Sequence, residues 1–347
     1  MKQMKAAMFY GPGDLRLESA PIPEVGDKDI LVRIGTSTTC GTDVKSYVRG
    51  YRNTKLPMIF GHEFAGEIVV MGDKVGEVRP DLKIGSRVVC ANSSPCFRCD
   101  YCRMGKFSLC ENIELLWGAF AEYIRVPSSI VNVNTYVLPD DLAYKDACLM
   151  EPLACVVHGI EESNVNLGDT LVINGAGPIG LFFVALASLK GARIISTDLS
   201  EERLEVARTL GAHETVNVSQ NTDVVKAIKD LTDGKGADVV VEATGLAPVW
   251  EQSVEMARKG GTVNLFGGPK TGSTFSVDTN RLHYDMLTLK AVYHHTPYYI
   301  EKALNLIKRR QISSDIFVTR EYPLGEVVTA MEAHKQQHVV KAALFPY

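Results

Sequence analysis

Residues 170–198 read TLVINGAGPIGLFFVALASLKGARIISTD: an apolar strand, a glycine-rich turn, an apolar helix and a second strand. The turn directly follows the strand and opens the helix, so its backbone N–H groups and the positive helix end would face a pyrophosphate. Glycines at this spacing also occur by chance, and the strand and helix around them give the motif its weight. We expect a dinucleotide to contact Gly175, Gly177, Pro178, Ile179 and Gly180.

Asp198 closes the second strand, 18 residues after Gly180. A carboxylate at this position can accept hydrogen bonds from the adenosine ribose hydroxyls and would repel a 2′-phosphate. We therefore expect NAD rather than NADP. Arg203 is predicted to lie against the adenine or ribose, although a solvated helix residue is an equally good interpretation.

The same alternation of helix and Val-rich strand continues to about residue 289, as in a parallel doubly wound sheet. Before it, residues 1–154 carry short β-like runs broken by Gly, Pro and Asp, which predict a mostly antiparallel β domain. After it, residues 290–347 contain a helix and a last strand that would return to the first domain. The α/β Rossmann domain, 155–289, is thus predicted to be inserted in the β domain.

Composition is that of an ordinary globular protein, with 46% hydrophobic and 22% charged residues in 347. A net charge of −4 and the lack of long Lys/Arg runs argue against a nucleic-acid partner. The sequence offers neither a signal-peptide h-region nor an 18-residue apolar stretch, which predicts no membrane association and a cytoplasmic location.

In such a reducing compartment, close-spaced cysteines are more often metal ligands than disulfides. Four of the eight form a cluster in a loop-like stretch, the predicted lobe 90–112. Four thiolates can surround Zn²⁺ tetrahedrally and close it to water, which makes a structural site. The predicted ligands are Cys96, Cys99, Cys102 and Cys110. Reduced loop thiols are the alternative; Cys90, Cys148 and Cys155 are interpreted as small buried residues.

Further candidate ligands lie beside carboxylates in two short motifs, Cys40-Gly-Thr-Asp43 and Gly-His62-Glu63-Phe-Ala-Gly, and a third acid, Glu151, lies at the expected domain junction. Together with the cysteine lobe and the glycine motif, these residues resemble the zinc-containing medium-chain alcohol dehydrogenases along essentially the whole chain. Within that family the chain resembles the polyol (sorbitol-type) and threonine dehydrogenase branch, since Glu151 stands where ethanol-type enzymes have a cysteine.

The resemblance implies a GroES-like catalytic domain, NAD and two zinc ions per chain, one catalytic and one structural. Cys40 and His62 would hold the catalytic zinc, with Glu63 and Glu151 sharing the remaining protein position and the water contact; which of the two binds directly stays open. Asp43 would accept the other ring N–H of His62 and fix its tautomer.

The implied chemistry is oxidation of a secondary alcohol to a ketone. Zinc lowers the pKa of bound water by about 8 units and would favour an alkoxide in the same way. The alkoxide then transfers hydride to the nicotinamide. Thr42 resembles the family hydroxyl that takes the alcohol proton.

We expect a sugar alcohol or cyclitol as substrate, with L-threonine or a butanediol-type alcohol as the alternative and a non-catalytic NAD(H)-binding protein as a distant one. Candidates for the substrate wall are Tyr47, Trp117, Phe120, His294 and His295. Oligomers are common in the family, which predicts a homotetramer or homodimer.

Lys45 stands where many relatives have a histidine at the outer end of the proton relay. It could act through cofactor hydroxyls or water, bind the substrate, or be a solvated lysine. If Lys45 belongs to the relay, we expect Lys45→Ala to change the pH–rate profile. An unchanged profile would remove it from the relay.

Overall fold

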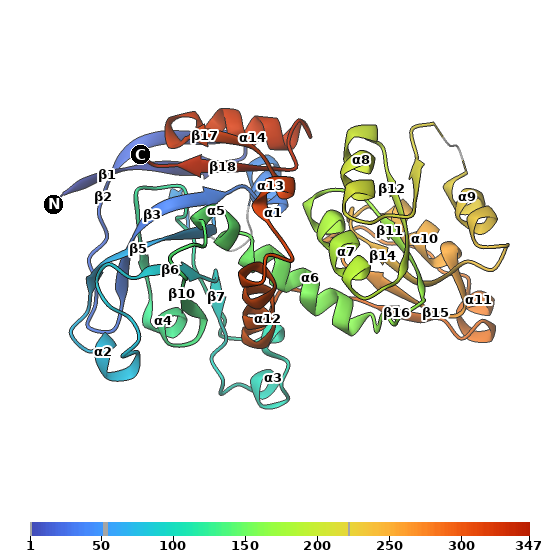
Figure 1. The fold of residues 1–347 in the computed structure, drawn as a ribbon, viewed down its shortest axis with the longest axis horizontal. Helices are drawn as coiled ribbons and strands as arrows, with labels where there is room; N and C mark the ends of the chain where they lie inside the picture. The colour runs from blue at the N-terminus through green and yellow to red at the C-terminus, as the bar shows by residue number, and fades with distance from the viewer. Residues whose placement is uncertain (1, 51–54, 221–222) are drawn as a thin grey trace. The chain divides into compact units, whose positions relative to one another are not determined.

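The computed structural model describes residues 2–50, 55–220 and 223–347, and in it the chain forms two compact units (Figure 1). The first consists of Met1–Ala154 and His295–Tyr347, and the second of Cys155–His294. The return to the first unit was expected at residue 290, and in the structure it follows His294.

A six-stranded, fully parallel sheet forms the second unit, in the order β13-β12-β11-β14-β15-β16. Numbered along the chain this is 3-2-1-4-5-6, the order of dinucleotide-binding Rossmann sheets, so the predicted fold is confirmed. The strands are β11 (Thr170–Asn174), β12 (Arg193–Asp198), β13 (Glu214–Asn217), β14 (Ala237–Glu242), β15 (Ala257–Leu265) and β16 (Thr288–Lys290). The helices are α7 (Pro178–Leu189), α8 (Glu201–Thr209), α9 (Val224–Leu231), α10 (Ala247–Met256) and α11 (Thr279–Tyr284).

Apolar β-branched side chains form the core of this sheet, because helices cover it: α7 and α8 contact β11 to β13, and α10 contacts β14 and β15. The strand order reverses between β11 and β14, whose carboxyl ends bear Gly175 and Thr244. This reversal is where open α/β sheets bind their ligands.

The first unit is built on a mostly antiparallel sheet in the order β10-β6-β5-β3-β18-β17, with β9 also paired to β3, and on a three-stranded sheet β2-β1-β4. Among the described strand pairs of the larger sheet, β17 and β18 are parallel and the others are antiparallel. Its strands are β1 (Gln3–Gly11), β2 (Asp14–Pro21), β3 (Ile30–Thr38), β4 (Met58–Ile59), β5 (Glu63–Met71), β6 (Arg87–Cys90), β7 (Ser93–Ser94), β8 (Glu114–Leu115), β9 (Tyr123–Val126), β10 (Thr135–Val137), β17 (Val318–Pro323) and β18 (Lys341–Phe345).

Short helices connect these strands: α1 (Gly41–Arg49), α2 (Val75–Val78), α3 (Asp100–Arg103), the 3-10 helix η1 (Phe107–Leu109), α4 (Ser128–Asn134), α5 (Tyr144–Ala147), α12 (Pro297–Lys308), α13 (Ser314–Phe317), the 3-10 helix η2 (Leu324–Glu326) and α14 (Val327–Lys335). Helix α6 (Met150–Glu162) continues the chain from the first unit into the second.

The last strand, β18, pairs with β3 in the middle of the larger sheet, as the predicted return to the first domain requires. Within the described part of the chain, no helix has the length and apolar character needed to cross a membrane.

The glycine-rich turn is tightly packed before any cofactor is considered. Gly175 has a φ of +100°, which favours glycine, and its N–H donates to the Thr197 carbonyl at 2.8 Å. A Cβ on Gly180 would lie 1.7 Å from the Gly175 carbonyl oxygen, whereas a Cβ on Gly177 would meet nothing closer than Arg203 Nη1 at 3.9 Å. Gly180 therefore keeps the helix close to the strand, and Gly177 leaves space above the turn.

We expect Gly180→Ala to lower the free energy of unfolding of the cofactor-free protein by about 1–3 kcal/mol, because backbone must move to admit the methyl group. Gly177→Ala is the matched control and should leave thermal stability near wild type. Differential scanning calorimetry of both variants checks this. Equal melting temperatures for the two would contradict the packing argument.

Candidate functional site

Cys40, His62 and Glu63 come together in the first unit, with one ligand atom from each within 4.8 Å of the others. Cys40 caps the N-terminus of α1, directly after β3, and Glu63 opens β5, which pairs with β3. Thr38 stands opposite Glu63 in this pair of strands, so strand pairing brings Cys40 close to Glu63, 23 residues further along the sequence. A thiol, an imidazole and a carboxylate are the donor types that Zn²⁺ accepts, so the set fits this metal.

Asp43 orients two of the three residues of this cluster, Cys40 and His62. Its Oδ1 lies 2.8 Å from His62 Nδ1, and its Oδ2 accepts the Cys40 N–H at 2.9 Å. Burial of the ring disfavours its charged form, but the Asp43 carboxylate raises the pKa of His62 well above its ordinary value. With Nδ1–H donated to Asp43, the ring would offer Nε2 to a metal that displaces the second ring proton, the arrangement expected of a carboxylate behind a metal-ligating histidine.

Glu63 is held by a buried lysine from the last strand. Lys341 Nζ lies 2.7 and 2.9 Å from the two Glu63 oxygens, and the Thr38 hydroxyl also donates to this carboxylate. Both charged side chains are almost fully buried. Burial would lower the pKa of Lys341, but Glu63 raises it above the ordinary value, so the lysine stays charged. The pair satisfies the condition under which buried charges are tolerated.

Glu151 lies in the first turn of α6 and is buried. Burial raises the pKa of Glu151 to about 7, the His62 charge opposes that rise, and Glu63 adds to it. Its Oε1 lies 3.8 Å from Nε2 of His295, a residue that is also buried. Glu151 therefore shares an electrostatic environment with the cluster, while its carboxylate faces a second histidine.

The other residues predicted around the catalytic zinc differ in their exposure. Thr42 and Lys45 are exposed on α1, and the Thr42 N–H points at Cys40 Sγ at 3.4 Å. The Trp117 ring lies 5.1 Å from the His62 ring, edge to face, so Trp117 stays a candidate for the substrate wall. Phe120 and Tyr47 are buried in the hydrophobic core of the first unit, which argues against that role for them.

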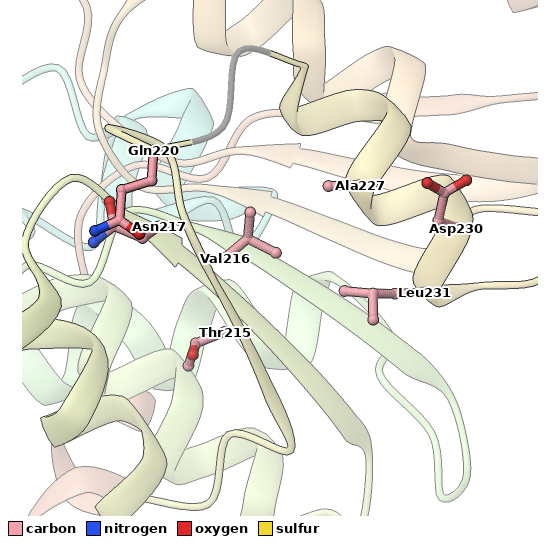
Figure 2. A pocket seen from close by; sticks show the side chains of 7 residues that line it. All are labelled: Thr215, Val216, Asn217, Gln220, Ala227, Asp230 and Leu231. Carbon is pink, nitrogen blue, oxygen red and sulfur yellow. The ribbon is translucent and has the colours of Figure 1, made fainter.

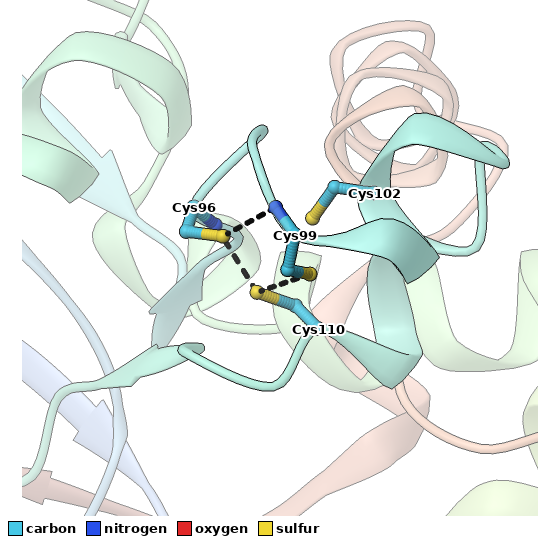
Figure 3. A group of neighbouring side chains, drawn as sticks. All are labelled: Cys96, Cys99, Cys102 and Cys110. Atoms are coloured by element: carbon cyan, nitrogen blue, oxygen red, sulfur yellow. Dashed lines mark hydrogen bonds between the residues drawn. The ribbon is translucent and has the colours of Figure 1, made fainter.

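The four predicted cysteines of the lobe converge, all four sulfurs lying within 4.8 Å of one another (Figure 3). Backbone N–H groups of Arg98 and Cys99 lower the pKa of Cys96 to about 6, and those of Cys102 and Glu111 lower the pKa of Cys99. Burial instead raises the pKa of Cys102 and Cys110. Four sulfurs at this spacing, two of them stabilised as thiolates, fit a closed tetrahedral zinc site.

The remaining cysteines lie apart from this cluster. Cys90 and Cys148 are buried, in agreement with their interpretation as packing residues. Cys155 was also interpreted as a small buried residue, and this was wrong, because Cys155 is only partly buried.

In the second unit, Gly177 caps α7 and Pro178 occupies its first turn, so the helix N-terminus opens at the glycine motif. Asp198 Oδ2 accepts the Ala176 N–H at 2.6 Å and Oδ1 accepts the Ser200 N–H at 2.9 Å. The carboxylate is thereby fixed beside the turn. Arg203 is half-buried, and its Nη1 is the atom nearest to the open side of Gly177.

A cavity of about 470 Å³ lies elsewhere in the second unit, between β13 and α9 (Figure 2). Its lining residues are Thr215, Val216, Asn217, Gln220, Ala227, Asp230 and Leu231. None of them is a predicted site residue, and the cavity plays no part in the sites described above.

Sequence analysis missed Lys341 and Asn92, although one signal was available. Lys341 is a single charge within the apolar run HVVKAALFPY, and a lysine in a buried strand requires an acidic partner. Asn92, whose Oδ1 lies 2.9 Å from His295 Nε2, gives no signal in the sequence.

Comparison with known proteins agrees with this geometry. Residues 26–135 match the family model of the alcohol dehydrogenase GroES-like domain, and residues 178–309 match that of zinc-binding dehydrogenases. Sorbitol dehydrogenase of Bacillus subtilis is 29% identical, covering 99% of this chain and 98% of its own. D-Arabitol-phosphate dehydrogenase of Enterococcus avium is 30% identical (99% and 97%), and L-threonine 3-dehydrogenase of Bacillus subtilis is 32% identical (99% and 99%).

Solved structures are equally similar over the whole chain. A protein described as a zinc-binding dehydrogenase from Sinorhizobium meliloti, bound to NADP, superposes with a TM-score of 0.92 at 30% identity and covers 100% of both chains. The 2R,3R-butanediol dehydrogenase of Bacillus subtilis superposes with a TM-score of 0.88 at 28% identity, covering 99% of this chain and 100% of its own.

We expect Cys102→Ala to reduce the zinc content from two ions per chain to one, because the lobe then lacks one of four ligands. Cys90→Ala, which removes a buried thiol outside the lobe, is the matched control and should retain two. Elemental analysis of freshly purified protein measures the ratio. Two zinc ions per chain in the Cys102 variant would exclude the four-cysteine site.

Proposed function

Because this chain belongs to the zinc-type medium-chain alcohol dehydrogenase family, in its polyol and threonine dehydrogenase branch, we propose that it oxidises a polyol to a ketone with NAD. The chain is a dehydrogenase by family. The substrate class, the preferred coenzyme and the roles of individual residues are our proposal. The observation that carries it is the convergence of Cys40, His62 and Glu63, with Asp43 hydrogen-bonded behind the histidine.

Zinc, when bound, supplies the positive charge that makes an alcohol acidic near neutral pH, and the dinucleotide supplies the hydride acceptor. Cys40 Sγ and His62 Nε2 would hold the metal. Asp43 keeps the proton of His62 on Nδ1 and so keeps Nε2 available. The exposed Thr42 hydroxyl, two residues after Cys40, would take the alcohol proton and pass it outward.

Glu63 and Glu151 would have different roles at the metal. A carboxylate oxygen of Glu63 lies within 4.8 Å of the ligand atoms of Cys40 and His62, which supports Glu63 as the third protein ligand. Among the residues that the structure describes, Glu151 does not group with those two residues, and its Oε1 lies 3.8 Å from Nε2 of His295. We assign Glu151 to contact with the metal-bound water or with the substrate.

Asp198 supports NAD as the coenzyme. Two backbone N–H groups fix its carboxylate beside the glycine turn, where a 2′-phosphate would meet a negative charge. The solved relative that binds NADP shows that the fold itself does not exclude a 2′-phosphate. The preference for NAD over NADP would therefore depend on Asp198 and on the distance of Arg203 from the ribose.

A polyol is supported by relatives named for sorbitol and D-arabitol phosphate and by the polar side chains around Glu151. Buried hydrogen-bonding groups reject substrates that leave them unpaired. L-Threonine is the second candidate, supported by a relative at 32% identity over nearly the whole chain, and a butanediol-type alcohol is supported by a solved structure. A non-catalytic role is disfavoured, since the chain retains Cys40, His62, Glu63 and Glu151 together. A homotetramer or homodimer stays a prediction.

The test is a panel of sugar alcohols, cyclitols, L-threonine and 2,3-butanediol, assayed by nicotinamide reduction with NAD and with NADP. We expect the highest kcat/KM for a polyol with NAD, and loss of activity after chelation. Asp198→Asn should reduce the preference for NAD over NADP about tenfold or more, because it removes the charge that opposes a 2′-phosphate.

Asp238→Asn is the matched control, because Asp238 lies near the start of β14, at the opposite end of the parallel sheet. It should not change the coenzyme ratio. A higher kcat/KM for L-threonine or for butanediol than for every polyol would favour the alternative substrates. A higher kcat/KM with NADP would show that the assignment from Asp198 is wrong.

A further inference from the structure

Glu242 is a fully buried carboxylate at the carboxyl end of β14, in the second unit. Its Oε1 accepts the N–H of Thr244 at 2.7 Å and that of Gly245 at 2.9 Å, and the Thr244 hydroxyl donates to the same oxygen. Burial raises the pKa of Glu242, and these hydrogen bonds oppose the rise. The carboxylate is therefore held by the turn that follows its own strand, and the proposed chemistry makes no use of it.

The backbone of Glu242 contacts the turn after the next strand as well. Its carbonyl accepts the N–H of Phe266 at 3.0 Å and that of Gly267 at 2.8 Å, directly after β15. A Cβ on Gly267 would lie 2.2 Å from the Gly245 nitrogen and 2.6 Å from Glu242 Oε2. The turns after β14 and β15 thus meet backbone against backbone around this carboxylate, at a contact that only glycine permits.

The turn after β14 also lies against the glycine-rich turn after β11. The Ala243 N–H donates at 2.9 Å to the carbonyl of Asn174, the residue before Gly175. A Cβ on Gly175 would lie 2.8 Å from Thr244 Cγ2, so the two turns are in direct contact. The strands β11, β14 and β15 are neighbours, and the strand order reverses between the first two of them. The three turns therefore meet where open α/β sheets bind their ligands.

Hydrogen bonds at its hydroxyl fix the side chain of Thr244. Its Oγ1 accepts the N–H of Leu246, the N-cap of α10, at 3.1 Å and donates its own hydrogen to Glu242. With the hydroxyl engaged on both sides, the methyl group faces Gly175. Glu242 thus determines, through Thr244, which surface the glycine-rich turn packs against.

This restraint matters for binding because glycine has unusual conformational freedom. Gly175 has a φ of +100°, and a turn rich in glycine leaves such a conformation at little steric cost. A ligand that binds a turn already held in one conformation does not lose affinity in ordering it. The contacts around Glu242 supply that restraint from outside the glycine motif.

We propose that Glu242 is a positioning residue for the dinucleotide: by fixing Thr244 and Gly245 it holds the turn after β14 against the glycine-rich turn and keeps the latter in its binding conformation. This inference rests on the coenzyme assignment in the proposed function. Because its side chain is fully buried, Glu242 acts through the turns and not by contact with the coenzyme.

The variants separate the acceptor oxygens from the volume of the side chain. Glu242→Met removes the oxygens at similar length, and Glu242→Gln keeps one that can accept from the Thr244 and Gly245 N–H groups. Thr232→Val is the matched control, because Thr232 is buried before the start of β14, where its hydroxyl accepts the Gly236 N–H at 2.9 Å. Thr244→Val, which removes the hydroxyl and keeps a methyl group, is a second route should Glu242→Met fail to fold.

The dissociation constant of NADH, or of NADPH if the wild-type protein binds it more tightly, is measured by nicotinamide fluorescence. Melting temperature and amide hydrogen exchange are measured on the coenzyme-free protein. In Glu242→Met we expect the dissociation constant to rise about tenfold or more and exchange in residues 174–180 to become faster, because the turn loses its restraint. Glu242→Gln should stay near wild type. Thr232→Val should melt earlier and keep the wild-type dissociation constant.

An unchanged dissociation constant in Glu242→Met or, if that variant does not fold, in Thr244→Val would overturn the inference. So would an equal rise in Glu242→Gln, or in Thr232→Val, where the cause would be lost stability. If the wild-type protein binds neither NADH nor NADPH, the coenzyme assignment fails and the inference fails with it. Wild-type binding together with unaltered variants leaves the proposed function intact and removes only the role of Glu242.

Discussion

The carboxylate of Asp43 is the contact on which the candidate catalytic site depends. It is fully buried and accepts from Cys40 N–H through one oxygen and faces His62 Nδ1 through the other. One side chain therefore joins the start of α1 to the segment before β5. A buried carboxylate without partners would be strongly disfavoured, so these contacts stabilise the fold and orient two candidate ligands together.

A second constraint is the compensation of buried charge. The first unit buries three carboxylates near one another, those of Asp43, Glu63 and Glu151. Lys341 balances one of them from the last strand of the chain. This contact gives a functional reason for the return of the C-terminal segment to the first unit, because without β18 the Glu63 carboxylate would be buried next to like charges and lack a cation.

Sequence alone was sufficient for the Rossmann fold, because its signals are local: apolar strands, a glycine turn and helices in strict alternation. The four-cysteine lobe could also be predicted from the sequence, since its four candidate ligands lie within 15 residues. Lys341 and Asn92 were missed because their partners, Glu63 and His295, lie 278 and 203 residues away. A spacing rule cannot detect such contacts. The buried lysine could have been found from its apolar context, whereas an asparagine in a loop is compatible with many environments.

Two glutamates near one metal site would be interchangeable if chemistry alone decided their roles, and the resemblance to a family left the choice open. The structure differentiates them by their partners. Glu63 extends from a central strand and is restrained through both oxygens, so its position is set by the sheet. Glu151 extends from the first turn of a helix, and its Oε1 lies 3.8 Å from Nε2 of the buried His295. A carboxylate that is held through both oxygens, as that of Glu63 is, suits a constant ligand of a metal.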